Sequence, residues 1–236
     1  MGPEHGGRSM TAEPVRAVVF DLDGVLIDSE SLWDDVRRGL AADAGRPWPG
    51  EATRAMQGMS TPEWSAYLTD VVGVPGTAEA AAVTVIDQVA AAYRSELPLL
   101  PGAFEVVERL GERFVLGLAS SSPRRLIDAV LQAAGLTDRF RATVSTEEVT
   151  AGKPSPDVYL EVTRRLGVRP EASAAIEDSS NGLRAAARAG LAVIALPNPT
   201  FPPADDALAL AAVVAGSLDE ITPDLVVAAA ARRSPS

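Results

Sequence analysis

Two aspartates, Asp21 and Asp23, stand one residue apart at the end of the apolar run 17–20, and Gly24 follows them. Side chains two positions apart project to the same side of an extended segment, so both carboxylates can face one point. This pair suits phosphoryl transfer, because one carboxylate can attack phosphorus while the other protonates the leaving oxygen and then deprotonates a water molecule. We therefore expect Asp21 to be a nucleophile and Asp23 an acid and base, with a bound cation reducing their repulsion.

Polar residues follow three further apolar stretches and could complete a phosphate site. Ser120 and Ser121 follow one of them, Glu177 and Asp178 follow another, and Lys153 comes a few residues after the third. Hydroxyl and N–H groups at the start of a helix bind phosphate oxygens, and a lysine adds a positive charge. Acids from two strand ends can hold Mg²⁺, which prefers oxygen ligands. Lys153 is the only lysine among 21 cationic residues, so we expect it to have a specific role.

The elements that would position these residues alternate along the chain. Apolar, β-branched runs predict strands at residues 17–20, 114–119, 142–144, 174–176 and 192–196. Helices are predicted between them at residues 104–110, 124–134, 156–166 and 183–189, with proline near their starts and glycine after their ends. This alternation predicts an α/β fold with a Rossmann-like, doubly wound parallel sheet covered on both faces. Ligands bind such sheets at the carboxyl ends of the strands, where the polar residues stand.

One region interrupts the alternation. Residues 32–97 carry helical patterns without a clear strand, at 32–44, 50–56, 62–72 and 78–95. We interpret them as a small helical cap domain inserted into a core made of residues 14–31 and 98–226. Residues 1–13 are expected to be a disordered leader, in which Met1 or Met10 could be the native start, and residues 227–236 a frayed tail.

Composition excludes several classes of function. The formal net charge of −11 disfavours nucleic acid and membrane surfaces as partners. The chain has no cysteine, and its only histidine is His5 in the leader, so thiol catalysis and histidine-based triads are excluded from the folded part. Without a signal-peptide pattern or an apolar stretch of membrane-spanning length, we expect a cytoplasmic protein, and a monomer is the default.

Each candidate residue also has a plainer interpretation. The Asp-x-Asp-Gly stretch does not continue as a calcium loop, because apolar residues occupy the positions of later ligands. Ser121 and Ser122 could be helix caps, with Ser122 the better candidate. The arginine pairs 124–125 and 164–165 are expected to face solvent. The tryptophans of the insert are expected to form its core, with Trp33 as a possible exception beside the hinge.

Four stretches of the chain resemble a known family. DLDGVLIDS, LASSS, GKPSPDVYL and IEDSSNGLRAA are similar, in this order, to the four motifs of the haloacid dehalogenase superfamily. The insert directly after the first motif resembles the C1-capped subgroup, which contains β-phosphoglucomutase and many sugar phosphatases. The resemblance covers roughly residues 15–225. The second aspartate of the first motif argues against a true dehalogenase, which lacks that acid and needs no Mg²⁺.

The resemblance implies a role for each motif residue. Asp21 would be the nucleophile and Asp23 the acid and base, while Ser120 and Lys153 would bind the phosphate. Mg²⁺ would be held by Asp21, the backbone carbonyl of Asp23 and Asp178, and Glu177 would be a further ligand or an acid beyond direct contact with the metal.

Two positions distinguish a phosphatase from a mutase within the subgroup. Trp33 stands where β-phosphoglucomutases have a histidine that helps to gate the acid and base. Ala55 stands where they have a phosphate-binding arginine, with Arg54 one position away. Trp33 and Arg54 are therefore the candidates in the insert for gating the substrate. The stretches DSESLW, LPLLPG and LGLASSSP are more similar to hexitol and 2-deoxyglucose-6-phosphate phosphatases. We therefore expect a Mg²⁺-dependent phosphatase acting on a small phosphorylated metabolite, a sugar or polyol phosphate. A sugar phosphomutase and a catalytically idle phosphate-binding module are the alternatives.

Overall fold

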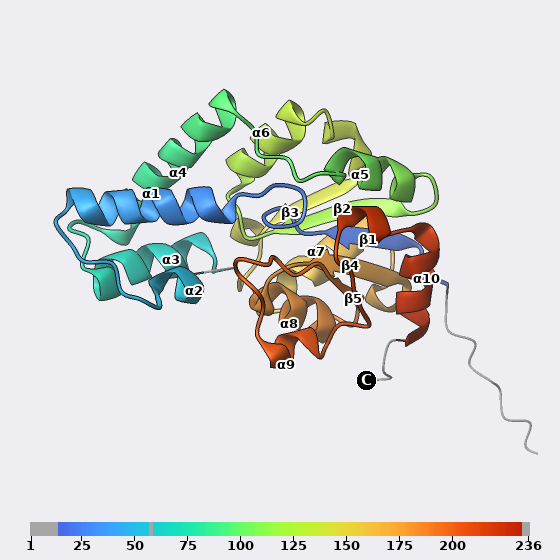
Figure 1. Ribbon diagram of the computed structural model, residues 1–236. Coiled ribbons are helices and arrows are strands. Elements are labelled where there is room, and N and C mark those ends of the chain that lie inside the picture. The colour runs from blue at the N-terminus through green and yellow to red at the C-terminus, as the bar shows by residue number, and fades with distance from the viewer. Residues whose placement is uncertain (1–13, 57–58, 233–236) are drawn as a thin grey trace, which may run out of the picture.

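Strand β1 (Ala17–Phe20) lies inside a six-stranded parallel sheet in the computed structural model of the chain, which describes residues 14–56 and 59–232. The strand order is β3-β2-β1-β4-β5-β6 (Figure 1). The other strands are β2 (Val115–Ser120), β3 (Ala142–Ser145), β4 (Ser173–Glu177), β5 (Ala192–Ala195) and β6 (Val213–Val214). The order reverses at β1, which places a ligand-binding crevice at the carboxyl ends of β1, β2 and β4. The predicted α/β fold with a doubly wound parallel sheet is confirmed.

Helices cover both faces of this sheet, as the fully apolar strands require. Val18 and Phe20 of β1 belong to the core shared with α5 (Ala103–Gly111), α6 (Arg124–Ala133) and α10 (Pro223–Arg232). Ala17 and Val19 belong to the core shared with α7 (Asp157–Leu166) and α8 (Ser180–Arg188). All four side chains of β1 are fully buried, so the strand that precedes Asp21 is fixed by packing on both sides.

The region predicted as an insert contains only helices among its described residues: α1 (Glu30–Asp43), α2 (Ala52–Met56), α3 (Thr61–Tyr67), a π-helical turn (Leu68–Val72) and α4 (Ala78–Ser95). They lie together beside the sheet (Figure 1), and we call them the helical insert. The two connections to the core run side by side. Ile27 forms an antiparallel bridge with Leu99, and the N–H of Asp28 donates to the carbonyl of Pro98 at 2.8 Å. Both ends of the insert are therefore fixed next to the end of β1.

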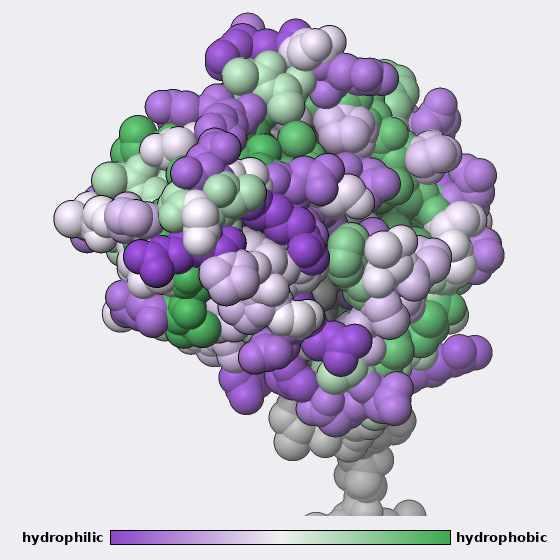
Figure 2. All heavy atoms as spheres, turned by 60° about the vertical axis from the view of Figure 1, so that its left-hand side comes forward, coloured by the Kyte–Doolittle hydropathy of each residue, from purple (hydrophilic) through white to green (hydrophobic). Residues whose placement is uncertain are grey.

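Figure 2 shows the face of the molecule that carries the insert. Polar and apolar side chains are intermixed on this face, and the apolar ones form no single broad patch. In the described part of the chain, no helix has the length and apolar character needed to cross a membrane.

The structure differs from the predicted elements mainly at their ends. Helix α6 begins at residue 124 as predicted, whereas α7 begins one residue later than predicted, and Pro123 and Pro156 are the N-cap residues. Strand β6, the short helix α9 (Asp205–Leu208) and helix α10 lacked a recognisable pattern. Helix α10 continues past residue 226, where the tail was expected to begin, because Val226 and Ala229 are both buried. The predicted leader, residues 1–13, lies outside the described residues.

The close packing of α7 on β2 generates a stability prediction. A Cβ atom at Gly117 would lie 2.9 Å from Val162 Cγ2 and 3.0 Å from Leu166 Cδ1. We expect Gly117→Ala to lower the free energy of unfolding in urea by about 1–3 kcal/mol, as overpacked cores do. Gly111→Ala is the control, since its Cβ would meet only Leu116 Cδ1, at an ordinary 3.5 Å, and should change stability by less than about 0.5 kcal/mol. Equal effects of the two substitutions would contradict this packing.

Candidate active site

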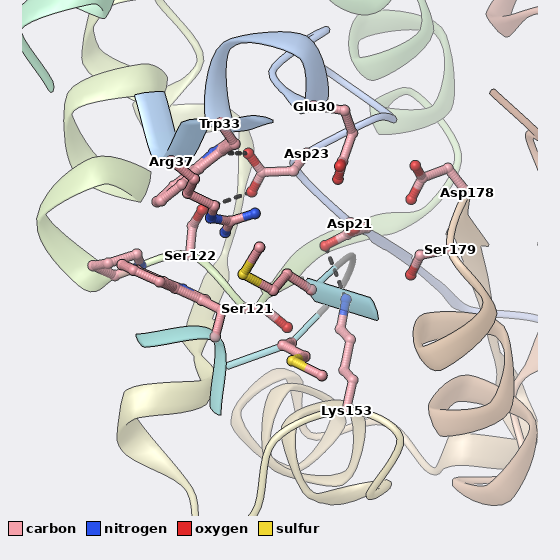
Figure 3. A pocket seen from close by; sticks show the side chains of 14 residues that line it. Asp21, Asp23, Glu30, Trp33, Arg37, Ser121, Ser122, Lys153, Asp178 and Ser179 are labelled. Atoms are coloured by element: carbon pink, nitrogen blue, oxygen red, sulfur yellow. Dashed lines mark hydrogen bonds and ion pairs between the residues drawn. The ribbon is translucent and has the colours of Figure 1, made fainter. Parts of the chain in front are cut away.

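A cavity lies between the carboxyl ends of β1, β2 and β4 and the helical insert (Figure 3). Side chains from both parts of the molecule form its wall. They are Asp21, Asp23, Glu30, Trp33, Arg37, Met56, Met59, Trp64, Ser121, Ser122, Pro123, Lys153, Asp178 and Ser179. The cavity therefore collects Asp21, Asp23, Asp178 and Lys153 from separate strand ends, whereas Glu177 is fully buried and is not part of the wall.

Lys153 is the cation at the base of this cavity. Its side chain is 1% exposed, and Nζ donates to Asp21 Oδ1 at 2.9 Å, to Glu177 Oε1 at 2.6 Å and to the carbonyl of Ala119 at 3.1 Å. The three N–H groups of the ammonium are thus used by one carboxylate from β1's end, one from β4 and one carbonyl of β2. Lys153 joins the three strand ends and fixes the direction of Asp21.

Both carboxylate oxygens of Glu177 are occupied by protein donors. Oε1 accepts hydrogen bonds from Lys153 and from the hydroxyl of Tyr159 at 2.8 Å, and Oε2 accepts from the N–H groups of Asp178 and Ser179. A Cβ at Gly182 would lie 1.8 Å from Oε1, so this glycine makes room for the carboxylate. Glu177 was expected to be either a metal ligand or an acid beyond direct contact with the metal. Because both of its oxygens already have protein donors, the geometry favours the second role, in which Glu177 positions Lys153.

Burial dominates the electrostatics of the acids. It raises the pKa of Asp21 from 3.8 to about 8, helped by the carboxylate of Glu177 and opposed by Lys153. Burial also raises the pKa of Asp178 well above its usual value, with Glu177 and Asp21 adding to the effect. Burial by itself would lower the pKa of Lys153, but the charges of Asp21 and Glu177 raise it above its usual value, so the lysine stays protonated.

Oxygen atoms of Asp21, Glu177 and Asp178 lie within 4.8 Å of one another, close enough to share a cation. Asp178 Oδ2 is buried and has no hydrogen-bond partner. Gly24, at a φ of +79°, brings the backbone so close that a Cβ would lie 2.0 Å from this oxygen. A buried carboxylate oxygen without a donor, beside Asp21 with its raised pKa, suits a divalent ion with oxygen ligands such as Mg²⁺.

Asp23 turns to different partners from Asp21. Its Oδ1 accepts hydrogen bonds from Ser29 Oγ and, at 3.3 Å, from Trp33 Nε1, and its Oδ2 accepts from Ser122 Oγ at 2.6 Å. Figure 3 shows its carboxylate directed at Trp33 and Ser122 while that of Asp21 is directed at Lys153. The two aspartates line one cavity, as their spacing predicts, but in this structure they do not face a single point.

The serine loop after β2 has a different arrangement from the expected one. Ser121 and Ser122 line the cavity, whereas Ser120 is fully buried behind them. Its hydroxyl accepts a hydrogen bond from the N–H of Ser122 at 2.9 Å and donates to Asp23 Oδ2 at 3.4 Å. Ser122, interpreted from the sequence as a helix cap, uses its hydroxyl for Asp23 instead, because Pro123 occupies the N-cap position. The geometry favours Ser121 as the hydroxyl that meets a ligand, and the role expected of Ser120 stays a prediction.

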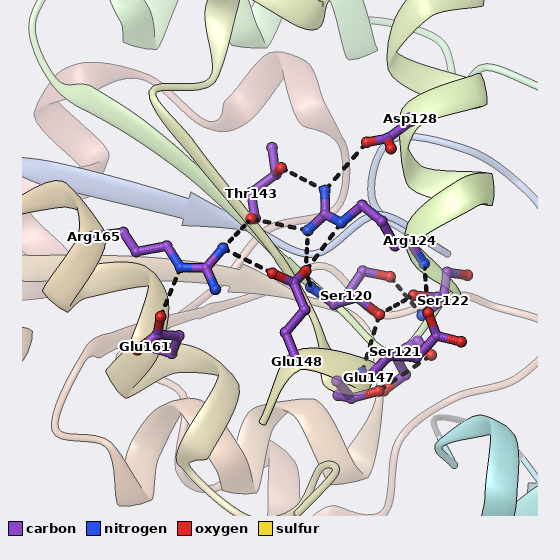
Figure 4. A network of polar contacts seen from close by, with 12 residues as sticks. Ser120, Ser121, Ser122, Arg124, Asp128, Thr143, Glu147, Glu148, Glu161 and Arg165 are labelled. Atoms are coloured by element: carbon purple, nitrogen blue, oxygen red, sulfur yellow. Dashed lines mark hydrogen bonds and ion pairs between the residues drawn. The ribbon is translucent and has the colours of Figure 1, made fainter. Parts of the chain in front are cut away.

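A polar network fixes this loop from the side away from the cavity (Figure 4). Arg124 donates to Thr143 and to Glu148, and Glu148 also pairs with Arg165 of α7 at 2.9 Å. Glu147 accepts from the N–H of Arg124 at 3.0 Å. Arg125, Arg164 and Arg165 are exposed, as expected, whereas Arg124 is only half-exposed. Arg124 and Arg165 nevertheless do more than face solvent, because their ion pairs with Glu148 connect α6, β3 and α7.

The helical insert contributes several residues to the wall. Trp33 lines the cavity, and the gating role expected of it stays a prediction, whereas Arg54 is exposed and is not part of the wall. Glu30 and Arg37 were missed, although the spacing 30, 33, 37 places them with Trp33 on one face of a helix. Burial raises the pKa of Glu30 to about 7, with Arg37 opposing the shift.

With this geometry in hand, comparison with known proteins gives consistent results. A family model for haloacid dehalogenase-like hydrolases matches residues 15–190. The chain belongs to this family. It is 36% identical over 218 residues to hexitol phosphatase B of Escherichia coli K12, covering 90% of this chain and 96% of that protein. It is 33% identical over 178 residues to a phosphorylated carbohydrates phosphatase of Thermotoga maritima, covering 75% and 82%. The crystal structure of CbbY from Rhodobacter sphaeroides in complex with phosphate matches with a TM-score of 0.77 and 28% identity, covering 87% and 96%.

The raised pKa of Asp21 generates a prediction for this haloacid dehalogenase-like hydrolase. Because the folded pKa of about 8 exceeds the ordinary 3.8, the folded state binds this proton more tightly. The resulting stabilisation is complete below about pH 4 and is lost as the pH rises through about 8. In EDTA, the melting temperature should therefore fall between pH 5.5 and 8.5, and this fall should be shallower in Asp21→Asn.

Mg²⁺ should raise the melting temperature more at pH 8.5 than at pH 5.5, because a metal ion needs ionised carboxylates. An identical pH slope for the wild type and Asp21→Asn, or a Mg²⁺ effect that does not change with pH, would contradict this account.

Proposed function

We propose that the protein is a Mg²⁺-dependent phosphatase that hydrolyses a small phosphorylated carbohydrate, a sugar or polyol phosphate, through a phosphorylated Asp21. The observation that carries the proposal is the position of Asp21, fixed by Lys153 at 2.9 Å beside the unpaired Oδ2 of Asp178 on the cavity wall. The family supports a hydrolase, and the relatives named as hexitol and phosphorylated carbohydrates phosphatases support the substrate class.

The first step would be attack of Asp21 on the phosphorus of the substrate. Lys153 holds Oδ1, which leaves Oδ2 without a hydrogen bond to any described residue. Oδ2 forms the new bond to phosphorus, and the bond from phosphorus to the sugar oxygen breaks. That oxygen takes a proton from Asp23. Lys153 and the N–H groups at the start of α6 offset the charge of the transferring phosphoryl group.

The second step would be hydrolysis of the phosphorylated aspartate. Asp23, now ionised, removes a proton from water as the water oxygen attacks phosphorus, and the bond to Asp21 Oδ2 breaks. Free phosphate leaves, and both carboxylates return to their starting states. Asp21 and Asp178 would hold the Mg²⁺, which supplies charge neutralisation for the phosphoryl oxygens when bound.

Asp23 connects this chemistry with the helical insert. In the structure its carboxylate is bound to Ser29, Trp33 and Ser122, so it has to turn toward the leaving oxygen before it can transfer a proton. Ser29 and Trp33 come from the start of α1. We therefore propose that the insert acts as a cap, which closes over the substrate, excludes water and releases Asp23 when the substrate is bound.

Loss of the nucleophile is the direct test. Asp21→Asn should reduce phosphate release from sugar and polyol phosphates to the background level, because an amide cannot form the phosphorylated intermediate. EDTA should stop release by the wild type, and excess Mg²⁺ should restore it.

The matched control for this test is Asp28→Asn, which removes the same charge from an exposed position on the same loop and should leave release unchanged. Equal turnover in EDTA and in Mg²⁺ would contradict the metal assignment, and turnover by Asp21→Asn would contradict the nucleophile. Conversion of a sugar 1-phosphate to its 6-phosphate without free phosphate would identify a mutase instead.

Asp23→Asn should lower kcat by about 10²–10⁴, the usual contribution of a general acid and base. The leaving oxygen of a nitrophenyl phosphate needs no protonation in the first step. In this variant, a nitrophenyl phosphate should therefore phosphorylate Asp21 faster than an alkyl phosphate does. Single-turnover kinetics can separate the two steps. An equal loss for both substrates in the first step would show that Asp23 does not protonate the leaving oxygen.

A further inference from the structure

Arg37 is a buried cation that the proposed reaction does not use. Arg37 is only 8% exposed, and its Nε is buried without a hydrogen-bond partner. No described carboxylate lies within 4.0 Å of the Arg37 guanidinium. The ion pairs that the structure shows for other arginines lie on the surface or are half-buried. A guanidinium carries five N–H donors, and leaving a charge buried and unpaired is costly. A group of this kind needs an acceptor that the described residues do not supply.

Two tryptophans hold Arg37 in place. Its Cζ lies 4.9 Å from the ring centroid of Trp33 and 4.9 Å from that of Trp64, and the two rings are 5.8 Å apart at 64°. Contacts of this kind attract a cation and restrict its orientation. Burial lowers the pKa of Arg37 to about 10, so the guanidinium remains charged at neutral pH.

The acids nearest to Arg37 are occupied or directed elsewhere. Asp34 is bound by Arg38 at 2.6 Å and by Thr53 at 2.5 Å. Asp23 is bound by Ser29, Trp33 and Ser122. Glu30 favours the charged form of Arg37 but makes no ion pair with it. Figure 3 shows the guanidinium entering the cavity from the insert, while Lys153 reaches it from the core. The missing acceptor can therefore come from a molecule in the cavity.

We propose that Arg37 binds a second anionic group of the substrate, a carboxylate or a second phosphate, at the end remote from the transferred phosphoryl group. This inference rests on the proposed phosphatase function and narrows its substrate class to phosphorylated sugar acids or sugar bisphosphates. The planar guanidinium matches the two oxygens of such a group. Glu30, on the same face of α1, can accept a hydrogen bond from a hydroxyl between the two anionic ends.

Three ligands with one carbon skeleton test the proposal. Glucitol 6-phosphate, gluconate 6-phosphate and glucitol 1,6-bisphosphate differ only at carbon 1, which is the carbon of a hydroxymethyl group, of a carboxylate and of a phosphorylated hydroxymethyl group, respectively. Their dissociation constants are measured by calorimetry with Mg²⁺ on the full chain carrying Asp21→Asn, which does not consume them. We expect at least one acidic ligand to bind about 10- to 100-fold more tightly than glucitol 6-phosphate, as a charged hydrogen bond contributes.

Substitution of Arg37 shows whether this preference comes from the guanidinium. Arg37→Gln should reduce the ratio of the dissociation constants to about one, and Arg37→Lys, which keeps the charge but loses the planar fork, should give an intermediate ratio. Arg38→Gln is the matched control, because it removes the same charge from an exposed position on the same helix, and should keep the wild-type ratio. Circular dichroism checks that each variant is folded. If Arg37→Gln does not fold, Arg37→Lys is used for the comparison instead.

The outcomes separate the proposal from the function on which it rests. A preference for the carboxylate or for the second phosphate identifies the anionic group, and either supports the subsite. A ratio of about one with Arg37 present, or a ratio unchanged when Arg37 is replaced, would overturn it and leave Arg37 a purely structural residue. Failure of the phosphatase function would appear separately, as no phosphate release from any of the three ligands by the wild-type chain with Mg²⁺.

Discussion

The ion pairs of Lys153 with Asp21 and Glu177 bury charge at the point where three strands of the sheet end, and the site depends on them. Both carboxylates and the ammonium are nearly inaccessible to water. Such a cluster is stable only when each charge has partners, and Tyr159 and two backbone N–H groups complete the shell of Glu177. Asp178 adds a third acid to one lysine, so three carboxyl groups share a single counter-charge and the pKa values of Asp21 and Asp178 are raised. A divalent cation would favour their ionised forms, and such an ion together with a phosphate group suits the cavity.

The parallel sheet makes this concentration of charge possible. Asp21, Lys153 and Glu177 are far apart in the sequence. Pairing of β1 with β4 brings Asp21 and Glu177 to one edge of the sheet, and pairing of β1 with β2 and of β2 with β3 brings the loop of Lys153 to the same edge. The carboxylates of Asp178 and Glu177 have room because glycines, which lack a Cβ atom, stand next to them. Gly24 leaves room for Asp178, and Gly182 leaves room for Glu177. Local backbone and long-range topology are therefore both needed to place the acids.

Elements with strong local patterns could be predicted from the sequence, whereas side-chain directions could not. The buried strands and the helices between them have continuous apolar runs or helical spacing, and their predicted ends differ from the structure by at most three residues. Arg37 and Arg38 show the limit, because they are adjacent residues of one type. Arg38 is exposed and paired with Asp34, while Arg37 is buried between two tryptophans. Only the packing of α1 against α3 distinguishes these two arginines. Likewise, only tertiary contacts direct the hydroxyl of Ser122 to Asp23 rather than to the N–H groups at the start of α6.

Helix α1 connects recognition with catalysis in the proposed function. Trp33 donates a hydrogen bond to Asp23, and one helical turn further on Arg37 contacts the ring of the same tryptophan. A ligand that pairs with Arg37 would therefore act on the side chain that restrains Asp23. Asp21 is held by the core and needs no such change, since Lys153 already fixes it. In this proposal the sheet positions the nucleophile, whereas the insert, which would meet the rest of the substrate, controls the acid and base. A substrate without the second anionic group would not contact Arg37 and so would not act on Trp33 and Asp23. Proton transfer by Asp23 would then be slower, in addition to the weaker binding.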